Sequence, residues 1–402
     1  MEKLFAVCAP GLEPFTALEL NRLGLISSAQ SCEAPESVYP GGAALTETGG
    51  VSFTGDLKEI YLANLHLRTA SRVLVRLGEF YAAAFSELRK KAGRLAWGRY
   101  LMPSQPVGIH VTCHRSRLYH SDAVAERIAG AIGDCLGQPP RVMKPDSGES
   151  YPNEETNFLS QLVVVRIVHD LCTISVDSSG ELLHRRGYRL ATAKAPLRET
   201  LAAGMLLASG WDQVSPLIDP FCGSGTIAIE AAMMALGIAP GRARHFAFMG
   251  WQDYEPALWD DILDENSLQI EKLKVERESQ LKIYASDRDA GAIQMAQANA
   301  SRMGVEQGIE FSCRAVSAIE PAGSGWVVTN PPYGLRVSAN NDLRNLYAQF
   351  GKVLKSKCPL WRVAILCNDF QLLRSTGLQF DTSLSLSNGG ITVRLARGVV
   401  GV

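Results

Sequence analysis

An amide, a main-chain carbonyl and an aromatic ring follow one another in the stretch Asn330, Pro331, Pro332 and Tyr333. An apolar run typical of a buried parallel strand, residues 326–329, comes just before it. Ligands of open α/β sheets bind at the carboxyl ends of such strands. The stretch therefore suits a site that grips an exocyclic amine and stacks on a planar base. Because Asn-Pro is also common in plain turns, the surrounding sequence must decide between the two interpretations.

A glycine loop upstream is a candidate nucleotide-binding turn. It lies between a predicted strand, residues 216–221, and an apolar helix, residues 227–236, and its glycines let a ligand approach the backbone closely. The loop consists of Cys222, Gly223, Ser224, Gly225 and Thr226. A dinucleotide fingerprint is excluded because Ala228 replaces its third glycine, and no P-loop Gly-Lys follows. The alternative is a tight turn without a ligand.

Two acidic residues at predicted strand ends indicate the kind of ligand. Asp219 precedes the loop, where it would repel a pyrophosphate but suit a cationic amine such as that of S-adenosylmethionine (SAM). Asp287 ends the next predicted strand, residues 281–286, and could accept both hydroxyls of a ribose. Asp289 is instead interpreted as the N-cap of a helix over 289–303. SAM is therefore the predicted cofactor.

With these motifs the chain resembles the THUMP-containing N2-guanine RNA methyltransferases, most closely the bacterial branch that modifies a guanosine of 23S ribosomal RNA. The stretches that carry the resemblance span nearly the whole chain: 9–13, 64–72, 184–189, 195–200, 219–226, 238–241 and 330–334, with Phe248 and Trp251. It implies SAM-dependent methylation of the exocyclic N2 amine of a guanosine, with 23S rRNA as the expected substrate. Open alternatives are a tRNA guanine-N2 methyltransferase, an adenine-N6 nucleic-acid methyltransferase and a non-catalytic RNA-binding factor.

The motifs and the resemblance together assign the site residues. The predicted catalytic residues are Asn330, Pro331, Pro332 and Tyr333. The predicted cofactor-binding residues are Pro196, Leu197, Asp219, Phe221, Cys222, Gly223, Ser224, Gly225, Thr226, Asp287, Arg288, Ala315 and Asn330. Ala315 stands where many members have an acid that binds the adenine amine, and Leu335-Arg336 replaces a more usual Glu-Arg pair. Adenine is then expected to rely on backbone groups, or SAM affinity to be lower.

Composition agrees with a soluble, reduced, intracellular protein. The chain has 402 residues, of which 46% are hydrophobic and 20% charged, enough for two or three domains with sizeable cores. No run of 18 apolar residues and no signal-peptide pattern is present, so a cytoplasmic location and no membrane association are expected. The nine cysteines are scattered, and no metal motif occurs, so no metal is predicted. Cys222 is better explained by packing than as a nucleophile.

The charge is unevenly distributed although the net charge is only −1. Residues 62–120 hold ten Lys/Arg against two Glu, whereas residues 1–61 hold three Lys/Arg against eight acids. A basic region with the interleaved aromatics Trp97 and Tyr100 is typical of RNA contact, although a solvated helix face is the alternative. The predicted RNA-binding residues are Arg68, Arg72, Arg89, Lys90, Lys91, Arg94, Arg185 and Arg186.

The predicted fold is α/β: a Rossmann-like SAM-dependent methyltransferase sheet of seven strands, whose last hairpin is antiparallel, after an α+β module. By resemblance, residues 1–55 form a ferredoxin-like module and residues 56–176 a THUMP domain that binds RNA. A linker, 177–195, leads to the methyltransferase domain, 196–402. The predicted partner is RNA, and the protein is expected to be a monomer.

Overall fold

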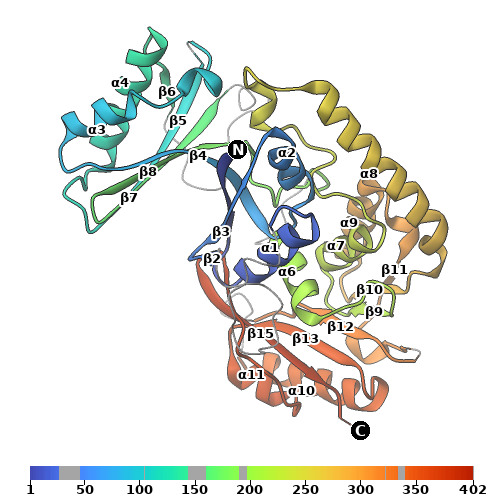
Figure 1. Ribbon diagram of the computed structural model, residues 1–402. Helices are drawn as coiled ribbons and strands as arrows, with labels where there is room; N and C mark the ends of the chain where they lie inside the picture. Colours follow the sequence, from blue (N-terminus) through green and yellow to red (C-terminus); the bar gives the residue numbers. More distant parts are fainter. Residues whose placement is uncertain are drawn as a thin grey trace.

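The computed structural model describes residues 1–26, 46–103, 105–143, 160–189, 197–321, 323–333 and 340–401. The described chain forms two β-sheets with helices packed against them, one sheet in each half of the sequence (Figure 1). Within these ranges no helix combines the length and the apolar character needed to cross a bilayer.

The first sheet has eight strands in the order β2-β3-β1-β4-β8-β7-β5-β6. They are β1 (Glu2–Cys8), β2 (Thr46–Glu47), β3 (Gly50–Gly55), β4 (Ala70–Tyr81), β5 (Pro106–His114), β6 (Arg141–Met143), β7 (Gln161–Val168) and β8 (Leu171–Asp177). The helices of this half are α1 (Glu13–Arg22), α2 (Leu57–His66), α3 (Phe85–Ala92) and α4 (Ser121–Leu136). The long strand β4 pairs with β1 on one side and β8 on the other, so one sheet is continuous past the predicted boundary at residue 55.

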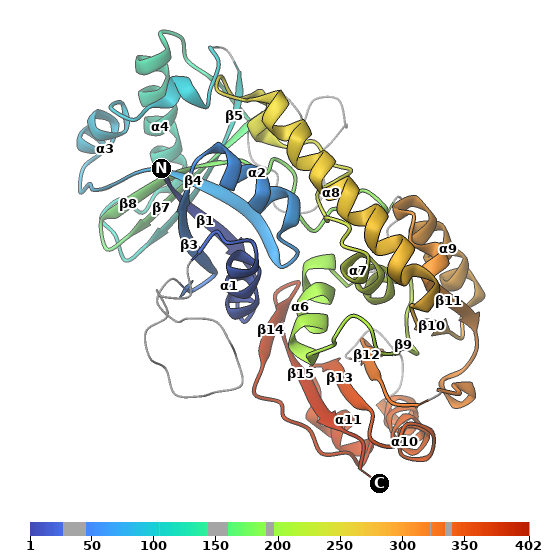
Figure 2. The ribbon, with the colours of Figure 1, turned by 45° about the vertical axis from the view of Figure 1, so that its right-hand side comes forward.

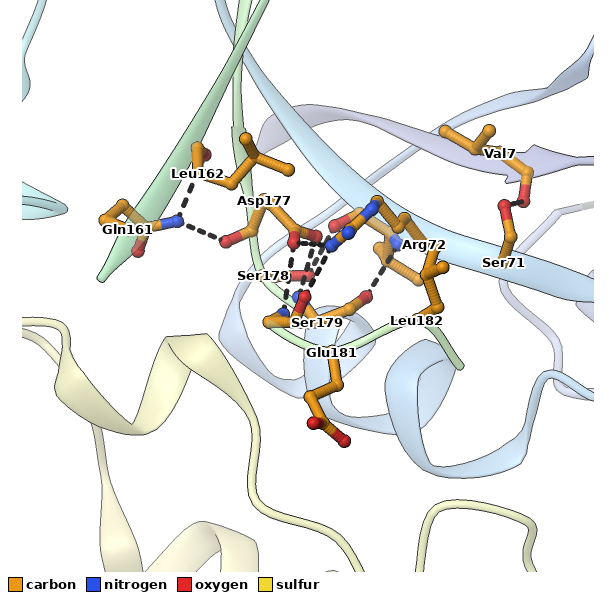
Figure 3. Close-up of polar contacts among 12 residues, drawn as sticks. Val7, Ser71, Arg72, Gln161, Leu162, Asp177, Ser178, Ser179, Glu181 and Leu182 are labelled. Atoms are coloured by element: carbon orange, nitrogen blue, oxygen red, sulfur yellow. Dashed lines mark hydrogen bonds and ion pairs between the residues drawn. The ribbon is translucent and has the colours of Figure 1, made fainter. Parts of the chain in front are cut away.

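The turn after β8 is fixed by side chains (Figure 3). Arg72, on β4, is ion-paired with the buried carboxylate of Asp177. Ser178 Oγ donates to the carbonyl of Val73 at 2.7 Å, and the N–H of Val73 donates to Ser179 Oγ at 2.8 Å. The segment that leads away from the first sheet, predicted only as a linker, is therefore bound tightly to that sheet over its first residues.

The second sheet has seven strands in the order β11-β10-β9-β12-β13-β15-β14. They are β9 (Leu217–Asp219), β10 (Ile283–Asp287), β11 (Ile309–Cys313), β12 (Trp326–Thr329), β13 (Arg362–Cys367), β14 (Ser385–Asn388) and β15 (Ile391–Val399). The first five pair in parallel, and β15 pairs antiparallel to both β13 and β14. This arrangement confirms the predicted α/β methyltransferase sheet with its antiparallel last hairpin.

Helices cover both faces of the second sheet. Because side chains alternate between the two faces along each strand, the strands contribute to a core on each side. The flanking helices are α6 (Glu199–Ser209), α7 (Thr226–Ala235), α9 (Ala290–Met303), α10 (Asn340–Lys357) and α11 (Phe370–Ser375). Leu217 and Val328 belong to the core under α6, α7 and α9, whereas their neighbours Ile218 and Val327 belong to the core under α10 and α11. The long helix α8 (Pro256–Arg277) runs along the outside from one half to the other (Figure 2).

The segment between α7 and α8, together with the first turns of α8, completes the core of the N-terminal half. The rings of Tyr61, on α2, and Phe248 stack with centroids 4.5 Å apart, and Trp259 meets Tyr61 edge-on at 5.8 Å. Trp251 Nε1 donates to Gln161 Oε1 at 2.9 Å. The segment from the end of α7 into α8 is therefore a structural bridge between the halves.

Some strands are shorter than predicted. The strand predicted over 216–221 ends at Asp219, because Pro220 has no N–H to donate and the N–H of Phe221 turns back to the Asp219 side chain.

Replacing Trp259 by Ala should lower the free energy of unfolding by about 3–5 kcal/mol, because the side chain is buried in the core shared by the two halves. Chemical denaturation measures this loss. Leu268→Ala is the matched control on the same helix, since Leu268 is 68% exposed; it should change stability by less than about 0.5 kcal/mol. Equal effects of the two substitutions would contradict the bridging role.

Candidate active site

The candidate site lies where the strand order of the second sheet reverses. From the neighbours β9 and β12, the sheet continues to β10 and β11 on one side and to β13 on the other. Ligands of doubly wound sheets bind at such a switch point. Asp219 ends β9 and Asn330 directly follows β12, so these two predicted site residues come to the same edge.

A hydrogen bond joins the two strand ends. Thr329 Oγ1 donates to Oδ1 of Asp219 at 2.6 Å, and the N–H of Phe221 donates to the same oxygen at 3.2 Å. Asp219 is only 1% exposed. Burial raises its pKa to about 7 against the lowering effect of the hydrogen bonds. Thr329 was not predicted as a site residue; a polar side chain at the last position of an apolar strand is the signal that could have identified it.

The glycine loop has the open backbone expected of a ligand cradle. Gly223 has φ +53°, and a Cβ built there would meet no atom within 4 Å. Gly225 has φ +85°, and its Cβ would lie 2.9 Å from that of Ala296, so glycine is required for the close packing of α7 on α9. The N–H of Gly225 donates to the carbonyl of Cys222 at 2.8 Å. The two glycines of the loop therefore have different roles: Gly223 faces open space, and Gly225 allows α7 to pack closely on α9.

Asp287 contacts the glycine loop directly. Its Oδ2 accepts the N–H of Gly223 at 3.0 Å, and its Oδ1 accepts the N–H of Asp289 at 3.0 Å. Asp289 caps α9 through the N–H groups of Gly291 and Ala292, as predicted from the sequence. Asp287 therefore lies at the position from which a carboxylate could reach a ribose, and it also holds the loop in place.

The motif after β12 presents an unpaired acceptor. Oδ1 of Asn330 is buried and has no hydrogen-bond partner within the described protein. Buried polar atoms are nearly always paired, so an unpaired one at a sheet edge favours a ligand that donates to it. Pro331 is buried and Pro332 exposed. Tyr333 is half-buried, and its hydroxyl accepts a hydrogen bond from Nδ2 of Asn388 at 3.1 Å.

Arg189 connects the segment before α6 to the glycine loop. It donates to Thr226 Oγ1 at 2.7 Å and to the carbonyl of Leu197 at 3.2 Å, and it is ion-paired with Glu199 at 3.3 Å. The buried Leu197 is thereby placed beside the start of α7. Pro196, Gly334, Leu335 and Arg336 lie outside the described residues. Arg189 was missed as a site residue, because it was noted only within the stretch 184–189 that carries the family resemblance.

The remaining residues predicted to bind the cofactor lie at the same edge of the second sheet. Arg288 is exposed and follows Asp287 directly, and the exposed Ala315 lies just after β11. The N–H of Arg314 donates to the carbonyl of Asp287 at 3.0 Å, which brings Ala315 close to the predicted ribose carboxylate. Burial raises the pKa of the Cys222 thiol, which agrees with packing and not with nucleophilic chemistry. Ser224 is half-buried in the loop, and its carbonyl accepts from Asn299 Nδ2 at 3.1 Å.

Several predicted RNA contacts need correction because the side chains are used within the protein. Arg186 is 1% exposed and pairs with the buried Glu230. Arg68 donates to the carbonyl of Ile238, on the opposite half of the molecule, and also faces Glu230. Arg72 is ion-paired with Asp177 at the turn after β8. Of the predicted aromatic partners, Trp97 is fully buried and Tyr100 is 3% exposed, so neither can stack on a base.

Other basic residues remain on the surface. Lys90 and Arg94 are exposed in and after α3, while Arg89 and Lys91 are partly exposed and paired with Asp134 and Glu87. Arg185 is partly exposed and pairs with Glu181. An exposed aromatic ring that the sequence analysis missed is Tyr119, which is 68% exposed and follows the exposed Arg115 and Arg117. Among the described residues, no group of three or more His, Cys, Asp or Glu could hold a metal ion.

Comparison with known families decides the affiliation. Residues 186–396, more than half of the chain, match the model described as "RMKL-like, methyltransferase domain". The chain belongs to this methyltransferase family. Residues 41–74 match the model of an "RlmL ferredoxin-like domain". The family affiliation predicted from the sequence is confirmed.

Curated relatives of this RMKL-like chain carry the name "Ribosomal RNA large subunit methyltransferase K/L". That of Shewanella sp. (strain W3-18-1) is 35% identical over 395 residues, which are 97% of this chain and 52% of that protein. That of Syntrophotalea carbinolica is 33% identical over 407 residues, covering 98% and 53%. The chain thus spans about half the length of the curated relatives it matches.

Solved structures with the same fold cover 98–100% of this chain. SMU.472, a methyltransferase candidate crystallised with SAH, has a TM-score of 0.82 at 29% identity and covers 100% of this chain and 98% of its own. A "predicted N6-adenine-specific DNA methylase" from Listeria monocytogenes has a TM-score of 0.81 at 32% identity, covering 98% and 95%. Thermus thermophilus TrmN, at 18% identity and a TM-score of 0.67, shares the fold.

The raised pKa of Asp219 predicts a pH dependence of stability. The unfolded chain loses this proton near pH 4, whereas the folded protein keeps it up to about pH 7, so the carboxyl lowers stability as pH rises through that window. Asn at position 219 can still accept both hydrogen bonds, since both go to one oxygen. Asp219→Asn should therefore gain stability over the parent by on the order of 4 kcal/mol between pH 4 and pH 7. Thermal unfolding of both proteins, free of ligand, measures the difference; a difference independent of pH would contradict the assignment.

Proposed function

We propose that this protein is a SAM-dependent methyltransferase acting on the exocyclic N2 amine of a guanosine in RNA, with large-subunit ribosomal RNA as the substrate. The observation that carries the proposal is the buried, unpaired Oδ1 of Asn330 at the switch point of the sheet, next to Asp219. An amine hydrogen would satisfy this acceptor. The names of the curated relatives supply the RNA class.

The residues at the switch point fit SAM. Gly223 leaves room for a ligand against the loop backbone, and the half-buried Asp287 can accept ribose hydroxyls beside it. The ionised form of Asp219 provides negative charge at the end where the amino-acid part of the cofactor would lie. SMU.472, which shares the fold over its full length, was crystallised with SAH. When bound, SAM supplies a methyl group that is already activated by its sulfonium.

The chain's own residues are assigned to orientation of the amine. The guanine N2 lone pair is delocalised into the ring and is a poor nucleophile. Oδ1 of Asn330 and the carbonyl of Pro331 would accept the two N2 hydrogens, which weakens this delocalisation and aims the lone pair along the reaction axis. Tyr333 would stack on the guanine after it has left its helix, a rearrangement that costs a few kcal/mol. The proton can pass to water after transfer, so alignment carries most of the rate.

We assign RNA docking to the N-terminal half. The exposed Lys90 and Arg94, with Arg115, Arg117 and the exposed ring of Tyr119, offer phosphate contact and stacking. Partly exposed Arg89, Lys91 and Arg185 would contribute through charge that their acidic partners only partly neutralise. The division into a ferredoxin-like module (1–55), a THUMP domain (56–176), a linker (177–195) and a catalytic domain (196–402) is part of this proposal.

Asn330→Ala should lower kcat about a hundredfold or more, because removing one preorganised polar group from a reacting centre typically costs this much. Affinity for SAH should stay within about threefold of the parent, since the glycine loop and the carboxylate of Asp287 supply most of the predicted cofactor contacts. Methyl transfer from labelled SAM to ribosomal RNA and calorimetry with SAH measure the two effects. The surface variant Asn21→Ala is the control. A normal turnover rate for Asn330→Ala would refute the assignment.

The methylated nucleoside decides between the base classes. Digestion of the RNA product and mass spectrometry should give N2-methylguanosine. N6-methyladenosine, or methylation of DNA in preference to RNA, would instead support the function named for the Listeria neighbour. Methyl transfer to tRNA but not to ribosomal RNA would leave the proposed reaction standing and would refute the proposed substrate.

A further inference from the structure

The amide of Asn388 contacts the aromatic ring of the candidate catalytic motif. Asn388 ends β14, at the turn of the last hairpin of the chain, and its Nδ2 donates to the hydroxyl of Tyr333 at 3.1 Å. The two residues are 55 positions apart in sequence, and both are half-buried. The hydrogen bond therefore links the motif after β12 to a distant edge strand.

The turn that carries Asn388 has a defined shape. Asn388 pairs with Ile391 across the hairpin, and the two residues between them, Gly389 and Gly390, have φ of +58° and +80°. A two-residue turn with positive φ at both positions matches the twist of the flanking strands. The amide thus projects from a rigid position.

Tyr333 lies where such a fixed partner is useful. Its ring packs at the border of the two cores that lie on opposite faces of the second sheet. A ring at the margin of the core can tilt more easily than one inside it. A hydrogen bond to its hydroxyl limits that tilt, and so sets the plane on which a base would stack.

The other side of the hairpin rests on the N-terminal half. A Cβ at Gly11 would lie 2.1 Å from the carbonyl oxygen of Ser385 and 3.0 Å from Cδ2 of Leu386, so the backbone after β1 packs directly on β14. Gly11 is held in turn by Glu13, whose Oε2 accepts its N–H at 2.6 Å. Strand β14 therefore lies between the proposed RNA-docking half and Tyr333.

We propose that Asn388 is a positioning residue for methyl transfer: it fixes the ring of Tyr333 against the hairpin, so that the flipped base stacks at the angle the reaction needs. This inference rests on the proposed function of the same site. It assigns to the last hairpin a role beyond closing the edge of the sheet.

A double-mutant cycle tests the pairing. Asn388→Leu keeps the approximate side-chain size and removes the donor, whereas Tyr333→Phe keeps the ring and removes the acceptor without altering the hairpin. Each should lower kcat about tenfold, the worth of one hydrogen bond of this kind. The double variant should be no slower than Tyr333→Phe, because that variant already lacks the hydrogen bond that Asn388→Leu removes. SAH affinity and the melting temperature should stay close to those of the parent, which separates positioning from a merely structural role.

Ser387→Ala is the matched control. Ser387 is the preceding residue of β14, so its side chain points to the opposite face of the hairpin, and kcat should not change. Normal turnover for Asn388→Leu, or losses that multiply in the double variant, would overturn the inference. If Asn388→Leu does not fold, Tyr333→Phe alone decides: full activity of that variant overturns the inference. Loss of activity in Asn330→Ala with no effect at positions 388 and 333 would leave the proposed function standing, whereas an active Asn330→Ala would remove the function itself.

Discussion

The arrangement of the two halves depends on one buried carboxylate, that of Glu230 on α7. It is inaccessible to solvent and is held by Arg186 at 3.2 Å and by Arg68 at 3.6 Å. Both guanidinium groups also donate to main-chain carbonyls, Arg68 to Ile238 and Arg186 to Leu183 and to Arg68 itself. Removing one partner of such a network leaves a buried charge unpaired, which typically costs 3–5 kcal/mol. Because α7 starts at the glycine loop, these arginines fix the candidate cofactor site relative to the first sheet.

The candidate site itself is built almost entirely from strand ends and is stiffened by contacts among them. Thr329 ties β12 to β9, Asp287 ties β10 to the glycine loop, and Asn388 ties the last hairpin to Tyr333. Asn330 is the exception, with an acceptor that no group in the described protein satisfies. A rigid frame around an unsatisfied acceptor is the arrangement expected when catalysis relies on orienting a substrate and needs no dedicated acid or base.

The sequence predicted most of the second sheet, because short apolar runs followed by Gly, Asp or Asn indicate parallel strands and the ends at which ligands bind. It also identified the α9 cap at Asp289 and the packing role of Cys222. It failed on the arginines: charge and spacing do not reveal that Arg186 and Arg68 are buried against a glutamate more than forty positions away. The prediction that Trp97 and Tyr100 stack on RNA was wrong for the same reason: the sequence around an aromatic residue does not show whether its ring faces solvent or the core. Long-range pairs such as Tyr333 and Asn388 leave no local pattern.

The aromatic residues that complete the first core have a consequence for biosynthesis. Phe246, Phe248, Trp251 and Trp259 pack with side chains from the beginning of the chain, although they follow the first strand of the other sheet. Because the chain is synthesised from its N-terminus, the apolar surface of the early part cannot be fully covered until residue 262 has been made. During that interval the nascent chain exposes an incomplete hydrophobic face, and such transiently exposed apolar surface favours aggregation.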